Sequence, residues 1–245
     1  MNTRKWVRFT VFNALVFAVA ACTHQPSNPR DPLEPMNRQI YQFNDKADRY
    51  VMKPVATSYH NVAPQPVRTG VNNFFSNLGD ASSAVNYTLQ GRAAPAFYNA
   101  SRFVLNSTVG LLGFLDVTGE EQRRYKRSGF GDTFARWGWK NSNYLVMPLM
   151  GPSTVRDGSG TVAGMAFQND VIYGHPDPLA KNVSSAASAI STRERLLGLE
   201  DTLEGAALDP YAYIRDGWLQ IRAKQVGDTL PQTKEEDINI DDLVK

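Results

Sequence analysis

Apolar residues recur at every third or fourth position along most of the chain, which is the spacing of one face of an α-helix. Six runs of this kind predict helices, at about residues 40–52, 64–78, 80–90, 95–108, 183–204 and 210–225. The first run is expected to end before Lys53-Pro54, and Asp80 is expected to N-cap the third run after Gly79 ends the second. The alternation typical of strands is scarce. The pattern therefore predicts a mainly α fold.

Two stretches depart from the amphipathic pattern. Residues 109–117 are almost wholly apolar and contain two glycines, and residues 134–151 place Phe, Trp and Tyr around a glycine and a proline. Both are too short or too interrupted to span a bilayer. Each is either a buried core segment or a wedge at a membrane interface, where Trp and Tyr rings are favoured. The candidate membrane-interface residues of the first stretch are Leu111, Leu112, Phe114 and Leu115.

The N-terminus has the pattern of an export signal. Three cations precede an apolar segment, residues 9–21, that is shorter than a membrane span. The sequence Val19-Ala20-Ala21-Cys22 then resembles a lipobox, so residues 1–21 are interpreted as a lipoprotein signal peptide. Cys22, the sole cysteine of the chain, is the predicted lipidation site, and two or more acyl chains give stable anchoring. Residues 22–35, rich in Pro, Ser and Asn, are interpreted as a lipidated, flexible tether.

Charge excludes one class of function. The full chain has a formal net charge of +2, and removal of the three cations in the signal leaves 23 Lys and Arg against 24 Asp and Glu. Nucleic-acid binding, which needs a basic face, is therefore not expected. Residues 120–128 are expected to be a solvated charged connector, and residues 228–245 an acidic, disordered tail that follows a helical domain at 36–227.

A catalytic or metal site is not evident. None of the three histidines has a second ligand at metal-binding spacing. Gly158-Ser159-Gly160 fits neither a nucleophile elbow nor a dinucleotide loop and is interpreted as a helix start or tight turn. A triad of Ser159, His175 and Asp177, which would make the protein a lipid-degrading hydrolase, has no support in the local sequence. We therefore expect no enzyme activity, no metal and no cofactor beyond the acyl groups on Cys22.

Short sequence blocks along the mature chain point to a family. Representative blocks are Asp31-Pro32-Leu33-Glu34, Lys53-Pro54-Val55-Ala56, Asn86-Tyr87, Arg102-Phe103, Gly113-Phe114, Pro148-Leu149 and Asp209-Pro210-Tyr211. In this order, over about residues 31–222, they resemble the MlaA/VacJ family of lipoproteins. The resemblance implies an all-α, ring-like assembly of amphipathic helices seated in one membrane leaflet.

The resemblance also implies a function. Such proteins are lipid-anchored in the periplasmic-facing leaflet of the Gram-negative outer membrane. They remove mislocalised phospholipids from the outer leaflet through a channel and pass them to a soluble periplasmic carrier, which maintains lipid asymmetry. A trimeric outer-membrane porin usually binds the lipoprotein. A non-transporting adaptor or surface lipoprotein, with a role in virulence or envelope integrity, remains the alternative.

Two places are expected to control the channel. Asn44 and Asp45 are the candidate gate, and residues 134–151, with Trp137, Gly138 and Trp139, are the candidate channel-lining hairpin. The family hairpin is richer in glycine, and Trp139 through Ser142 depart from that pattern. The hairpin is therefore expected to be stiffer here, or its gating different.

Overall fold

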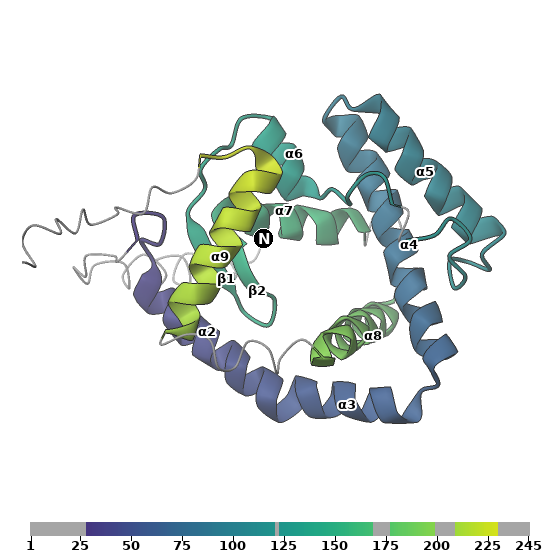
Figure 1. The fold of residues 1–245 in the computed structure, drawn as a ribbon, viewed down its shortest axis with the longest axis horizontal. Helices are drawn as coiled ribbons and strands as arrows, with labels where there is room; N and C mark the ends of the chain where they lie inside the picture. The colour runs from purple at the N-terminus through teal and green to yellow at the C-terminus, as the bar shows by residue number, and fades with distance from the viewer. Residues whose placement is uncertain (1–27, 121–122, 169–176, 199–208, 230–245) are drawn as a thin grey trace, which may run out of the picture.

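The computed structural model describes residues 28–120, 123–168, 177–198 and 209–229. Its helices are arranged around a central opening (Figure 1), and the predicted mainly α, ring-like fold is confirmed. The elements are α2 (Glu34–Ala47), η2 (Asp48–Met52), α3 (Lys53–Val62), α4 (Gln65–Leu89), α5 (Ala93–Thr108), α6 (Phe130–Arg136), β1 (Tyr144–Met147), β2 (Gly151–Thr154), α7 (Val155–Phe167), α8 (Pro178–Leu196) and α9 (Pro210–Val226). Cys22 and the predicted signal peptide lie outside the described residues.

The first helical run does not end at Lys53-Pro54 as predicted. It passes through the π-helical segment η2 and continues as α3 to Val62. The Lys53 N–H donates to the Asp48 carbonyl, and Pro54 then occupies the first turn of α3, where its missing N–H costs little. The wide π turn thus carries the chain past the proline, and α2, η2 and α3 form one side of the ring (Figure 1).

The second and third predicted helices are one helix, α4. Gly79 and Asp80 lie in its interior, so the prediction that Asp80 caps a separate helix is wrong. The local signals were sound, because glycine weakens a helix and aspartate favours its start. Tertiary contacts override them: a Cβ on Gly79 would lie 3.2 Å from the Arg127 Cδ, and Asp80 is bound by buried arginines.

Two helices pack inside or against the ring. α5 lies side by side with α4, while α8 lies within the ring against α3 and α4 (Figure 1). α8 runs from Pro178 to Leu196, earlier than the predicted 183–204, because Asp177 caps it by accepting the Leu179 N–H. The prediction of a helix at 210–225 is confirmed by α9, with Asp209 as its N-cap.

A short hairpin interrupts the helices. β1 and β2 pair antiparallel, with Tyr144 opposite Thr154 and Met147 opposite Gly151. The hairpin therefore begins ten residues later than the predicted segment 134–151 and extends beyond it to Thr154. The first part of that segment is instead the end of α6 and a turn. The turn at Gly138 has a φ of 111°, a conformation that only glycine adopts readily.

The two ends of the described chain meet at the hairpin. Tyr144, Val146, Tyr211 and Leu219 form a small buried core between β1 and α9. Asp31, assigned to the tether by sequence, is fully buried beside it and accepts hydrogen bonds from the Asn37 Nδ2 at 2.7 Å and the Tyr211 hydroxyl at 2.5 Å. Burial raises the pKa of Tyr211, and its bond to Asp31 adds to that shift. Residues 28–33 thus pack onto the body.

Candidate functional site

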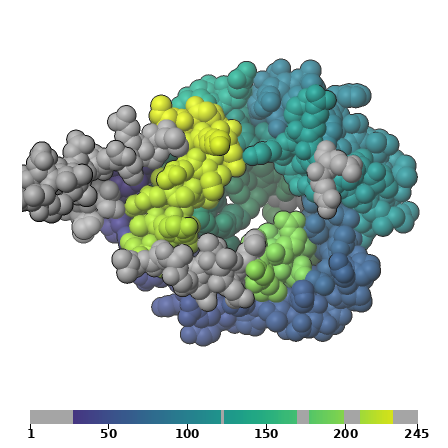
Figure 2. Space-filling view, viewed as in Figure 1, coloured from purple at the N-terminus to yellow at the C-terminus, as the bar shows by residue number. Residues whose placement is uncertain are grey.

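The opening of the ring contains a helix held by ion pairs. Figure 2 shows the ring hollowed at its centre, with α9, α8 and α4 at the border of the hollow. Glu194 of α8 binds Arg68 of α4 and lies 2.7 Å from the His60 Nδ1 of α3. Arg193 binds Asp48 through two bonds of 2.6 and 2.7 Å. α8 is therefore attached to the ring wall through charged groups.

The structure brings Asn44, one of the two candidate gate residues, to the turn of the hairpin. Its Nδ2 donates to the Met147 carbonyl at 2.9 Å, and its Oδ1 accepts the Leu149 N–H at 2.7 Å. Asp45, the other candidate, lies 3.6 Å from Arg49 in an exposed pair. Leu149 has a positive φ of 62° and an exposed side chain. Asn44 thus holds the irregular, apolar turn through two hydrogen bonds.

The candidate residues at 137–139 lie elsewhere. Trp137 ends α6, and its indole N–H donates to the Leu89 carbonyl at the end of α4 at 3.1 Å. Trp139 stacks on Phe134, with ring centroids 6.2 Å apart. The predicted channel residues therefore separate into two places: Asn44 at the hairpin turn, and the two tryptophans around the end of α6.

Residues 109–117, which we call the apolar connector, turn their side chains outward. Leu111 is 66% exposed and Leu112 is 71% exposed, and Phe114 and Leu115 are also exposed. Of the two interpretations of this stretch, a buried core segment is therefore wrong for these four side chains. An exposed apolar patch of this kind marks a surface that contacts a membrane or another protein.

The backbone of the apolar connector is satisfied internally. The Gly113 N–H donates to the Asn106 carbonyl at 2.8 Å, and the Leu115 N–H donates to the Gly110 carbonyl at 2.8 Å. Leu111 and Leu112 both adopt positive φ, at 52° and 59°, which costs about 1 kcal/mol or more for each side chain with a Cβ. The loop therefore maintains a strained backbone while it presents leucines to the outside.

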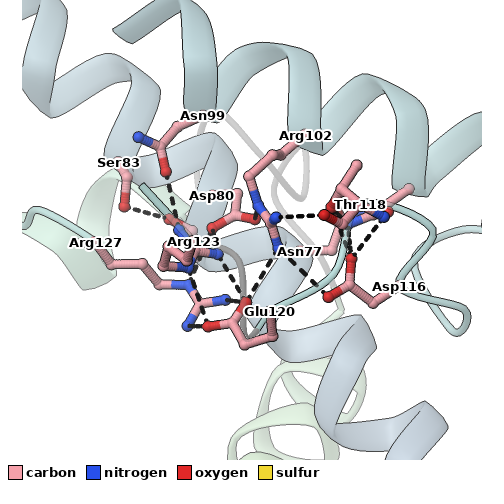
Figure 3. Close-up of polar contacts among 12 residues, drawn as sticks. Asn77, Asp80, Ser83, Asn99, Arg102, Asp116, Thr118, Glu120, Arg123 and Arg127 are labelled. Carbon is pink, nitrogen blue, oxygen red and sulfur yellow. Dashed lines mark hydrogen bonds and ion pairs between the residues drawn. The ribbon is translucent and has the colours of Figure 1, made fainter. Parts of the chain in front are cut away.

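Residues 120 and 123–128, which we call the charged connector, are bound to the ring. Figure 3 shows Asp80 of α4 enclosed by arginines: Arg123 at 2.6 Å, Arg127 at 3.0 Å and Arg102 of α5 at 3.3 Å. Asp80 is only 1% exposed. Glu120 binds the same three arginines at 3.0–3.1 Å. The prediction of a solvated loop at 120–128 is therefore wrong for Arg123 and Arg127, whose guanidinium groups bind the buried Asp80. Arg124 and Lys126 are exposed, as the prediction expects.

Side chains of α4 and α5 also bind the backbone of the charged connector. The Arg124 N–H donates to the Tyr98 hydroxyl at 3.0 Å, and the Tyr87 hydroxyl donates to the Lys126 carbonyl at 2.8 Å. The Ser128 N–H donates to the Ser83 Oγ at 3.1 Å. Contacts at alternate positions fix the connector in one conformation.

A second charged cluster joins α7 to α9. Burial alone would raise the pKa of Asp157, but hydrogen bonds from Arg222 and Arg156 outweigh it and lower the pKa to about 2. Arg156 is fully buried and binds Asp228 at 2.9 Å. Asp228, the first residue of the predicted disordered tail, is therefore bound to the body; residues 230–245 lie outside the described residues.

The described residues considered for catalysis make structural contacts. Ser159 lies in the first turns of α7, as the interpretation of a helix start predicted, and its hydroxyl donates to the Val155 carbonyl. Asp177 caps α8, and His175 lies outside the described residues. Within the described ranges, no group of three or more His, Cys, Asp or Glu side chains is placed to hold a metal ion. In those same ranges no helix is both long enough and apolar enough to cross a membrane.

The ring of helices agrees with the all-α, ring-like assembly that the resemblance to the MlaA/VacJ lipoproteins implies. The family model described as MlaA lipoprotein matches residues 29–225, and the chain belongs to this family. The Escherichia coli (strain K12) protein named intermembrane phospholipid transport system lipoprotein MlaA is 34% identical over 194 residues, 78% of this chain and 76% of the relative. A protein of the same name from Haemophilus influenzae is 31% identical over 237 residues, 92% of this chain and 94% of the relative.

A solved structure agrees with the fold. It comes from work described as the structural basis for maintenance of bacterial outer membrane lipid asymmetry. The match has a TM-score of 0.68 at 29% sequence identity and covers 81% of this chain and 99% of the solved chain.

Proposed function

We propose that this protein is an outer-membrane lipoprotein that moves mislocalised phospholipids out of the outer leaflet. The lipids pass through the opening of the ring and are handed to a soluble periplasmic carrier, and a trimeric porin holds the lipoprotein in place. The names of the family relatives, which specify intermembrane phospholipid transport, support this function. The acyl groups on Cys22 anchor the chain to the periplasmic-facing leaflet.

The observation that carries the proposal is the outward display of the apolar connector. Leu111, Leu112, Phe114 and Leu115 are exposed although water disfavours apolar surface, at roughly 25 cal/mol per Å². A position in the acyl region of one leaflet removes that cost, and the internal hydrogen bonds of the connector meet the requirement that backbone groups be satisfied in lipid.

The ring gives a physical reason for a protein in this process. A phosphate-bearing headgroup that crosses hydrocarbon without polar partners is strongly opposed by desolvation. The hollow of Figure 2 is bordered by α8, whose attachment to η2, α3 and α4 is charged. Polar groups at the opening replace water around the headgroup, and no bond has to be made or broken.

Asn44 is proposed to hold the gate, with Asp45 beside it, and Trp137 to Trp139 to line the route. Asn44→Ala removes both bonds to the hairpin turn, and we expect it to raise the carrier-independent passage of fluorescent phospholipid across proteoliposomes. Gln42→Ala, which removes an exposed amide from the same helix, is the matched control. Equal passage in the two variants would remove Asn44 from the gate.

The decisive experiment measures transfer of labelled phospholipid from proteoliposomes containing the full lipidated chain to a soluble lipid-binding carrier. We expect transfer that requires both proteins. A deletion strain should accumulate phospholipid in the outer leaflet and regain its barrier with the wild-type gene, whereas Cys22→Ser should restore it poorly. Absence of transfer together with an unchanged outer leaflet would refute the proposal.

A further inference from the structure

A large basic cavity lies beside the charged connector. It has a volume of about 970 Å³ and is formed by the C-terminal end of α4, the charged connector, α6 and the last turns of α9. α9 ends next to α6 in Figure 1. Eight of its lining residues are Lys or Arg and one is acidic. This concentration of positive charge contrasts with the near neutrality of the chain as a whole.

Five of these cations have no carboxylate partner among the described residues: Arg92, Arg124, Lys126, Arg136 and Lys224. The others are engaged. Arg127 binds Asp80, Arg222 binds Asp157 and Asp132, and the Lys140 Nζ donates to the Val226 carbonyl at 2.6 Å. The cavity therefore has unsatisfied positive charge on several walls.

The charged connector contributes part of the positive charge that lines the cavity. Arg123 and Arg127 are drawn to Asp80, while the backbone of the connector is bound by Tyr98 and Tyr87. Arg124 and Lys126, which lie between these two arginines in sequence, are exposed and line the cavity. These contacts thus fix the backbone that carries two of the cationic side chains before any ligand arrives.

We propose that this cavity binds the phosphate of a phospholipid and favours headgroups with net negative charge, such as phosphatidylglycerol, over zwitterionic ones. The inference rests on the proposed transport function and deepens it by naming a preferred substrate class. Guanidinium groups bind phosphate oxygens through paired, charge-assisted hydrogen bonds. The volume lies at the upper end of ordinary ligand sites and holds a headgroup with its glycerol.

The cavity offers no free carboxylate to the cationic end of a zwitterionic headgroup. Its one carboxylate, Asp132, is bound by Arg222 at 2.6 Å and by the Gly129 N–H at 2.9 Å. Its aromatic faces are occupied too. Arg92 lies over the Tyr87 ring at 5.0 Å, and Arg124 over the Tyr125 ring at 5.5 Å. An ammonium or choline group would therefore meet repulsion from the arginines and lysines with no free carboxylate to offset it, which is the source of the preference.

The cavity also has an apolar part. Ile221 on α9 is 62% exposed and lines it, together with the partly buried Val226. An amphiphile can place its phosphate on the arginines and its glycerol and first methylenes against these side chains. A free inorganic anion uses only the charged part, which lets an experiment separate the two.

The test is calorimetric titration of the full-length protein in neutral detergent with short-chain phosphatidylglycerol, short-chain phosphatidylcholine and inorganic phosphate. We expect the first to bind about tenfold tighter than the second, which corresponds to ~1.4 kcal/mol. Arg92→Gln/Arg124→Gln/Arg136→Gln should abolish this difference without weakening phosphatidylcholine binding. The charge-preserving Arg→Lys triple variant should retain most of the preference.

The matched control is Lys46→Gln/Arg49→Gln/Lys181→Gln, which removes three exposed cations outside the cavity. It should bind like the wild type. Equal affinity for both lipids, or an equal loss in the control, would overturn the proposal. So would inorganic phosphate binding as tightly as the lipid. Tight lipid binding that appears only after residues 230–245 are deleted would also overturn it, since it would assign the cavity to the acidic tail.

These outcomes are separable from failure of the proposed function. Transfer of phosphatidylcholine and phosphatidylglycerol at equal rates would refute the headgroup preference and leave transport standing. Loss of transfer for both lipids, with selective binding intact, would refute transport and leave the cavity assigned.

Discussion

The apolar connector and the charged connector follow one another between α5 and α6, and each contains side chains whose surroundings differ from those that their polarity normally favours. Residues 109–117, almost wholly apolar, point their leucines away from the protein. Residues 120 and 123–128, rich in charge, are bound to a carboxylate that is 1% exposed. In a protein surrounded only by water the opposite arrangement would be favoured.

On the proposed position in one leaflet, the difference corresponds to two environments around one molecule. Apolar side chains are stable on the surface when the surroundings are themselves apolar, and a buried carboxylate such as Asp80 is stable when cationic side chains of a neighbouring segment bind it. The transition occurs within a few residues. Asp116, at the end of the apolar connector, accepts hydrogen bonds from Asn106 at 3.0 Å and Thr118 at 2.7 Å.

The largest expected effect comes from removing the charge that holds the charged connector. Asp80→Asn leaves Arg102, Arg123 and Arg127 without their shared buried carboxylate, and we expect the free energy of unfolding to fall by about 3–5 kcal/mol. Urea unfolding in neutral detergent measures it. Asp45→Asn, an exposed carboxylate on α2, should cost less than ~0.5 kcal/mol. A small loss at Asp80 would show that the connector is held mainly by its backbone bonds.

Substitution in the apolar connector should affect membrane binding and spare folding. Leu111→Asn/Leu112→Asn keeps residues that tolerate positive φ but removes two exposed leucines, so we expect vesicle binding to weaken by about 2 kcal/mol with unfolding unchanged. Vesicle flotation of Cys22→Ser protein excludes the acyl anchor. Leu179→Asn, at an equally exposed leucine of α8, is the control. Undiminished flotation would contradict the membrane assignment.

A smaller effect is expected from removing one hydrogen bond to the backbone of the charged connector. Tyr87→Phe removes the hydroxyl that donates to the Lys126 carbonyl, which should cost about 1 kcal/mol in unfolding free energy. Tyr213→Phe removes an exposed hydroxyl and should cost nothing measurable. If both variants unfold alike, the charged connector does not depend on this bond.

The smallest expected effect is a change in acid sensitivity. Burial alone would raise the pKa of Glu120, but the hydrogen bond from Arg123 and the nearby Arg127 lower it below the ordinary value of 4.5. A depressed pKa contributes stability that is present above pH 4.5 and is lost as the pH falls through the folded value. Glu120→Gln should therefore flatten the fall of unfolding midpoints below pH 4.5. An unchanged slope would show that other carboxylates, such as Asp157, dominate.

The sequence predicted the helices better than their connections. The helical spacing of apolar residues and the capping signals were enough to predict α9, where Asp209 and Pro210 mark the start of the helix. They failed at Gly79 and Asp80, because the reasons for those residues, Arg127 and Arg123, lie more than forty positions away. The same limit applied to the site. Asn44 could be singled out through the family resemblance, but its two bonds to the hairpin turn depend on the fold.

The basic cavity could not be predicted from local sequence at all. Its cations come from α4, the charged connector, α6 and α9, and no local window holds more than a few of them. Ion pairing decides which of these cations can bind a ligand. Arg123 and Arg124 are neighbours in sequence, yet Arg123 is bound to Asp80 whereas Arg124 lines the cavity. The net charge of the chain does not distinguish the paired cations from the unpaired ones.

The bond between Asp31 and Tyr211 has a consequence for how the chain is made. It joins residues 180 positions apart, and the Arg215 contact with Asp31 spans 184. Contacts of such long range form late, because a large loop must first be closed. Synthesis and export proceed from the N-terminus, so α2 emerges long before its partner α9 exists. α9, the last of the described helices, closes the ring, and a chain cut short before Pro210 would remain an open arc with buried acids left without their arginine.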